Sequence, residues 1–187
     1  MRLKLINSCL SFFLYVGCLS DSNPDILKFE SILGERKTEA LNLLVLDFEE
    51  NLEKVYPELS LQLAYEQYLN DLIDPKENNW KKFDFQSDET HAEFINSGLK
   101  EEIYTFQKHY DHIEQDSISV IDVNQTGKYM RALFAVREVD TLVTVYCDKR
   151  EAGGLMQNEL IVNGILYYKP DFNNYFHKRI VVIEFSY

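Results

Sequence analysis

The sequence predicts a mainly α protein of the α+β class, a bundle based on a helical hairpin with a small β component near its C-terminal end. Two stretches, 38–55 and 61–73, carry apolar residues at the three- and four-residue spacing of amphipathic helices. A third stretch, 179–187, is rich in β-branched and aromatic residues, which is typical of a strand. No repeat or second linker divides residues 26–187, so we expect a single α-rich globular domain there.

Residues 1–17 have the layout of a signal peptide. Arg2 and Lys4 precede an apolar run over residues 5–16. That run is shorter than the roughly 20 residues that a helix needs to cross a bilayer. We therefore expect residues 1–17 to be a signal peptide that directs export and is then removed.

The junction Leu14-Tyr15-Val16-Gly17-Cys18 resembles a bacterial lipobox, although Tyr15 stands where these signals usually have an aliphatic residue. In such signals the cysteine is acylated on its thiol and becomes the new N-terminus. The resemblance implies lipidation of Cys18, with residues 18–25 as a lipidated tether. The alternative is a secreted protein cleaved after Ser20, because Cys18 and Ser20 also form a small-x-small pattern.

The chain is strongly acidic. Its 31 acidic and 19 basic residues give a formal net charge of −12. Removal of residues 1–17 takes away two basic residues and leaves 17 against 31, a net charge of −14. A field of this sign repels phosphate backbones and anionic headgroups, so we expect no nucleic acid partner and no charge-driven membrane binding.

Two short helices are expected after the first pair, one from Glu89 to Gly98 and one from Leu99 to Tyr110, with Gly98 as the cap between them. Residues 117–123 alternate like a strand, and 128–139 have helical spacing. The periodicity does not decide between helix and strand for 141–147 and for 158–168. We expect the strand at 179–187 to pair with 117–123 or 141–147, because a strand needs a partner.

The densest group of possible metal ligands surrounds His109 and His112, which would lie one turn apart on a helix. No matching ligands can be identified near His91 or His177, so we expect a solvated acidic helix end and assign no metal site. The sequence also lacks a nucleophile elbow, a glycine-rich phosphate loop and an EF-hand loop. We accordingly assign no catalytic residue and no cofactor.

Aromatic residues are numerous, with 12 Tyr, 12 Phe and one Trp, and several of them gather between Tyr167 and Phe176. Such a group could stack on sugars or a peptide, but core packing is the simpler interpretation. Cys147, which stands alone once Cys9 and Cys18 are set aside, is expected to be a small buried hydrophobe.

The leader, the acidic helical body and the lack of catalytic motifs together resemble the small uncharacterised envelope lipoproteins of Bacteroidetes-type bacteria. The resemblance implies an envelope location, periplasmic or surface-facing, and a membrane partner through the lipid on Cys18. The hypothesis is a non-enzymatic binding module that meets another envelope component. The alternative is a hydrolase or metal-dependent enzyme whose site is assembled from residues distant in sequence.

Overall fold

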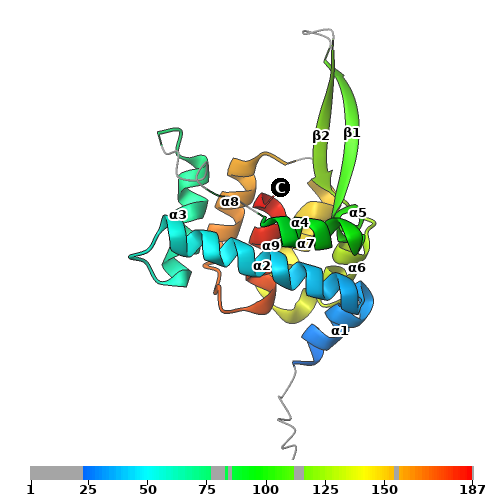
Figure 1. Ribbon diagram of the computed structural model, residues 1–187, viewed down its shortest axis with the longest axis horizontal. Helices are drawn as coiled ribbons and strands as arrows, with labels where there is room; N and C mark the ends of the chain where they lie inside the picture. Colours follow the sequence, from blue (N-terminus) through cyan, green and yellow to red (C-terminus); the bar gives the residue numbers. More distant parts are fainter. Residues whose placement is uncertain (1–22, 77–82, 84–85, 112–115, 154–155, 187) are drawn as a thin grey trace, which may run out of the picture.

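A computed structural model of the protein describes residues 23–76, 83, 86–111, 116–153 and 156–186 (Figure 1). Of residues 107–111 and 116–120 it describes the backbone alone. The described chain is mainly helical with a small antiparallel two-stranded sheet, which confirms the predicted class. In chain order the elements are α1 (Pro24–Leu33), α2 (Glu35–Val55), α3 (Leu61–Ile73), α4 (Asp88–Asn96), α5 (Leu99–Ile103), β1 (Tyr104–Asp111), β2 (Asp116–Val123), α6 (Lys128–Ala135), a 3-10 turn (Arg137–Val139), α7 (Thr141–Gly153), α8 (Asn158–Tyr167) and α9 (Tyr175–Phe185).

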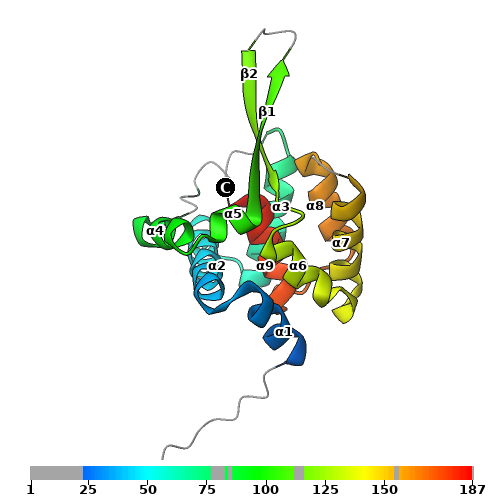
Figure 2. The ribbon, with the colours of Figure 1, turned by 90° about the vertical axis from the view of Figure 1, so that its right-hand side faces the viewer.

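The first predicted helix pair forms as α2 and α3, but its geometry differs from the expected antiparallel hairpin. Figures 1 and 2 show α3 standing crosswise to α2. The two helices meet through Phe48, whose ring centroid lies 5.5 Å from that of Tyr65. Tyr65 also stacks on Phe172 at 4.3 Å, so α3 is held between α2 and the C-terminal part of the chain.

The predicted strand at 179–187 is wrong, because residues 179–185 belong to helix α9 and Ser186 caps its end. Asn174 caps this helix by accepting a hydrogen bond from the backbone N–H of Phe176 at 2.8 Å. In Figure 1 α9 lies in the middle of the other helices, and residues 179–183 are all buried. A helix that is buried on every side has no polar stripe, so its apolar run looks like a strand.

The predicted strand at 117–123 is confirmed as β2, but neither expected partner pairs with it. Its partner is β1, in the register Tyr104↔Val123 through Asp111↔Asp116. The helix expected over Leu99–Tyr110 therefore ends at Ile103. Tyr104, Thr105 and Phe106 have high strand propensity, which outweighs the helical spacing here. The β component thus lies in the middle of the chain and not near its C-terminal end.

The two segments for which the periodicity did not decide between helix and strand are both helical. Residues 141–147 belong to α7 and residues 158–167 to α8. The helix expected over 128–139 is divided into α6 and the 3-10 turn. Gly98 separates α4 from α5 with φ +71°, the left-handed conformation that glycine adopts without strain.

Helix α1 was not expected from the sequence, and it includes Pro24 and Asp25 of the predicted tether. Its Phe29 is fully buried and lies edge-on to Tyr129 of α6, with 5.9 Å between the ring centroids. Among the residues that the structure describes, no helix combines the length and apolarity needed to cross a membrane.

A candidate binding cleft at the base of the hairpin

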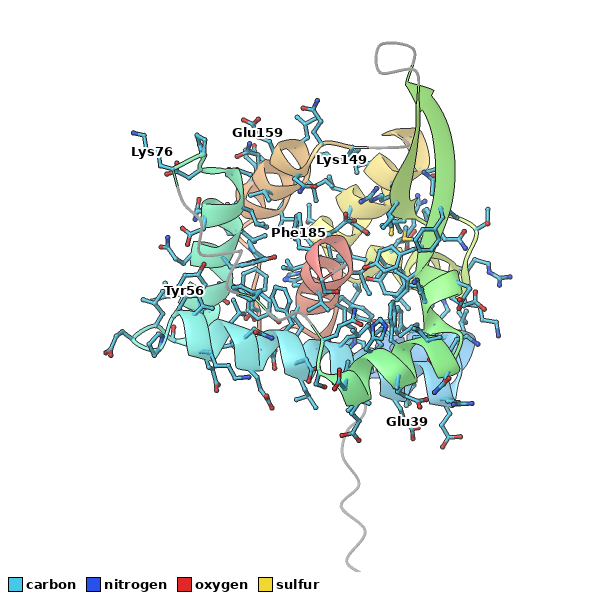
Figure 3. All side chains as sticks on the ribbon, turned by 45° about the horizontal axis from the view of Figure 1, so that its top comes forward. Glu39, Tyr56, Lys76, Lys149, Glu159 and Phe185 are labelled. Carbon is cyan, nitrogen blue, oxygen red and sulfur yellow. The ribbon has the colours of Figure 1, made fainter. Side chains whose placement is uncertain are left out.

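A cleft of about 320 Å³ opens on the face of the molecule from which the β1–β2 hairpin projects (Figure 3). Figure 3 shows Phe185 near the middle of this face, at the end of α9. The cleft is bordered by α3, the base of β1 and β2, α7, α8 and α9. It is lined by Tyr68, Leu72, Tyr104, Ile121, Asp122, Val123, Arg150, Met156, Asn158, Ile161, Ile183, Glu184 and Phe185. Most of these side chains are apolar, and the charged groups come from three different elements.

The two ends of the hairpin are tied together where they enter the helical body. The backbone N–H of Asn124 donates to the carbonyl oxygen of Ile103 at 2.6 Å, and the Asn124 side chain donates to that of Glu101 at 2.8 Å. The backbone of Gly127 passes so close that a Cβ there would lie 1.9 Å from the carbonyl oxygen of Glu102. Only glycine fits this approach, so the base of the hairpin is fixed beside the cleft.

Arg150 forms the floor of the cleft together with two carboxylates. Its Nε donates to Glu184 at 2.9 Å and its second terminal nitrogen donates to the other Glu184 oxygen, which makes a bidentate pair. Its remaining nitrogen donates to Asp122 at 3.1 Å. The hydroxyl of Tyr146 also donates to Glu184. The side chains of Arg150 and Glu184 are 3% and 2% exposed and that of Asp122 is 15% exposed, so a largely buried network links β2, α7 and α9.

Burial and pairing act in opposite directions on these groups. Burial lowers the pKa of Arg150, but the Glu184 carboxylate more than offsets this, and the pKa ends above its ordinary value. Burial raises the pKa of Glu184 against the opposing effects of Arg150 and Tyr146. Three of the five N–H groups of the Arg150 guanidinium donate to carboxylates, so its charge is already paired with Glu184 and Asp122. The floor carries two carboxylates against one guanidinium, so it favours a cation over an anion.

Two exposed apolar side chains continue the cleft onto the hairpin. Phe106 and Ile121 are opposite each other in the register, and their exposed fractions are 53% and 40%. The ammonium of Lys100 lies 5.0 Å from the Phe106 ring centroid. Below this pair, Tyr104 and Val123 are buried and lie at the cleft. An apolar surface thus runs from the hairpin down into the body.

A histidine–aspartate pair outside the cleft, His177 and Asp140, makes hydrogen bonds that stabilise helix ends. His177 Nε2 lies 2.8 Å from Asp140, and its Nδ1 accepts from the backbone N–H of Asp171 at 3.0 Å. Asp140 also accepts from the backbone N–H of Val143 at 2.9 Å. Partial burial raises the pKa of Asp140, but the bonds from His177 and Val143 bring it below its ordinary value. With both ring nitrogens occupied, His177 has none left to act as a general base.

Of the candidate site residues named from the sequence, none whose side chain the structure describes lines the cleft. Cys18 and His112 lie outside the described residues, as does the side chain of His109, whose backbone is in β1 and not in the expected helix. Within the described ranges, no three His, Cys, Asp or Glu side chains are grouped to hold a metal ion.

Cys147 is fully buried, as predicted. Burial raises the pKa of its thiol to about 12, so the thiol is unreactive.

The aromatic group between Tyr167 and Phe176 is divided between core and surface. Phe172 and Phe176 are buried, whereas Tyr167 is 77% exposed. The two phenylalanines therefore confirm the core interpretation, and no continuous aromatic platform forms.

Sequence reasoning missed Asp122, Arg150 and Glu184. A signal existed for Glu184, because it is a single charge next to the apolar run 180–183. A charge placed within a buried segment requires a partner. Its partner Arg150 could not be identified, because the two residues are 34 positions apart.

Comparisons of the chain with models of protein families, with curated proteins and with solved structures gave no match. The cleft and the hairpin therefore have to be interpreted from their own chemistry.

Proposed function

We propose that the protein is a lipid-anchored component of the bacterial envelope that acts as a non-enzymatic interaction module, with the hairpin and the cleft as its interaction surface. The observation that carries this proposal is the placement of α1 and the hairpin at opposite ends of the molecule. In Figures 1 and 2, α1 lies at one end of the helical body and the hairpin projects from the opposite end. Cys18 precedes α1 by only a few residues, so a lipid there would direct the hairpin away from the membrane.

The chemistry of the cleft supports binding over catalysis. Its buried charges pair with one another, and two apolar side chains of the hairpin, Phe106 and Ile121, are exposed beside it. Exposed apolar side chains beside a cleft are typical of surfaces that other proteins cover. The acidic net charge of −12 disfavours nucleic acid and anionic lipid as the bound component.

The anchor is tested by expressing the wild type and Cys18→Ser in a bacterium supplied with a fatty acid that carries a detectable tag. We expect the tag on the wild type in the membrane fraction and none on Cys18→Ser, because only a thiol at this position can be acylated. Wild-type protein that is released unlabelled would contradict the anchor and leave simple secretion.

The interaction surface is tested in the same cells with a photo-crosslinking residue at Ile121. Leu46 on α2 is the matched control, because it is 54% exposed and lies away from the cleft. We expect discrete crosslinked species from position 121 and none from position 46. Equal crosslinking at both positions would contradict a specific surface.

A further inference from the structure

Strand β2 borders the cleft along its edge. Ile121, Asp122 and Val123 all line the cleft, whereas β1 contributes only Tyr104. The side chains of successive strand residues point to opposite faces of a sheet. A cavity that is lined by three consecutive residues therefore lies beside the edge of the strand and not under one face of the sheet. In Figures 1 and 2 the base of β2 lies on the side of the hairpin toward α8.

The outer edge of β2 has hydrogen-bonding capacity. In the part of the chain that the structure describes, the sheet has two strands and β2 pairs with β1 alone. The backbone N–H of Val123 donates to its neighbour Asp122 at 2.8 Å, so it faces away from β1. Because N–H groups alternate in direction along an antiparallel strand, that of Ile121 also points outward. Pairing with a further strand can therefore begin at Ile121 and continue along β2.

The size and charge of the cleft indicate what such a strand would carry. A volume of about 320 Å³ suits one or two large apolar side chains against Leu72, Ile161 and Phe185. The floor has one more carboxylate than guanidinium. The whole chain has a net charge of −12, so basic residues in the added segment would be attracted by charge complementarity.

We propose that β2 takes up an extended segment of another envelope protein as a third strand, with an apolar side chain of that segment in the cleft and lysine or arginine residues beside it. This inference rests on the proposed function, and it specifies the chemistry of the partner. Recognition of this kind obtains affinity from main-chain hydrogen bonds and specificity from a pocket for alternate side chains.

The test measures the binding of synthetic peptides to the full-length protein purified in detergent. The probe is a fluorescent heptapeptide of sequence Lys-Val-Lys-Trp-Lys-Val-Lys. A second peptide carries N-methyl groups on alternate residues, which keeps its charge and side chains but removes donors from one edge. A third has glutamate in place of lysine. We expect each of these two to bind about tenfold more weakly or worse, the N-methylated peptide because it loses one or two main-chain hydrogen bonds and the glutamate peptide because its charge is repelled.

Variants of the protein test the location. Ile121→Lys should weaken binding of the probe about tenfold, because it places a like charge where the basic segment binds. Met156→Trp, which fills the cleft from the other side, should have a similar effect. Leu46→Lys adds the same charge on α2 and should leave binding unchanged.

Two results would overturn the inference. Equal affinity for the probe and its N-methylated form would mean that charge alone binds the peptide. A dimer in sedimentation analysis that Ile121→Lys dissociates would mean that a second copy of this chain occupies the edge. The labelling of Cys18 and the crosslinks from position 121 test the proposed function and are independent of these two results. Failure of the strand-addition inference can therefore be distinguished from failure of the proposed function.

Discussion

Arg150 and Glu184 lie almost completely out of water, yet neither is an obvious site residue in the sequence. Two charges in such an environment are stable only together, because each would lose its hydration without compensation if the other were absent. The same guanidinium also holds Asp122 at the base of β2. This side chain thus ties the base of β2 to α7 and α9.

Removal of Arg150 should be costly for this reason. We expect Arg150→Met to lower the free energy of unfolding by about 3–5 kcal/mol, since it leaves Glu184 as a buried charge whose main partner is gone. The double variant Arg150→Met, Glu184→Leu should lose much less than the sum of the single changes, because it removes both charges. Urea denaturation followed by circular dichroism measures all three.

Arg36→Met is the control, since Arg36 pairs with Glu93 at 3.0 Å but is 63% exposed. It should cost less than about 1 kcal/mol. If Arg150→Met costs no more than this control, the network at the floor of the cleft is not buried in solution.

At the scale of the element, the sequence predicted secondary structure correctly where a helix or strand has one exposed face and one buried face. The predicted helices at 38–55 and 61–73 and the predicted strand at 117–123 all form. The strand at 179–187 failed because α9 is surrounded by other helices. The helix expected through Tyr110 failed because the apolar residues from Leu99 onward suit either state, and pairing with β2 decides between them.

Helix α2 allows a direct test of its burial pattern, because Leu44 is 1% exposed and Leu46 is 54% exposed. Leu44→Ala should cost about 2–5 kcal/mol, and Leu69→Ala on α3, which is also fully buried, should do the same. Leu46→Ala should change the stability by no more than about 0.5 kcal/mol. A urea midpoint that moves equally for Leu44→Ala and Leu46→Ala would contradict the packing of α2.

At the scale of the whole molecule, one core of apolar side chains connects α1 to α9. The fold class was predictable because most of the chain contributes an amphipathic face to this core. The cleft was not predictable, because it arises where elements far apart in the sequence leave a space between them. Sequence spacing reports on neighbours within one element, whereas this site combines short segments of several elements, such as residues 121–123 of β2 and 183–185 of α9.

A core of this extent leads us to expect that folding requires no metal ion. The melting temperature of the purified protein should be unchanged by a strong chelator, and by the double substitution His109→Ala, His112→Ala. A structural zinc contributes roughly 10 kcal/mol or more to the folded state, so its removal would unfold the protein. Stoichiometric metal in the isolated protein, lost in the double variant together with several degrees of melting temperature, would contradict this expectation and support a metal-dependent enzyme.

The central position of α9 also determines when the chain can fold. Each helix that surrounds α9 is synthesised before it, so none of them can complete its packing until residues 175–185 have left the ribosome. A chain without its central helix lacks much of the apolar burial that makes the folded state stable. Bacterial export through a narrow protein-conducting channel requires an unfolded substrate. For the exported protein that we propose, this order of synthesis would delay folding during translation and so favour passage across the membrane.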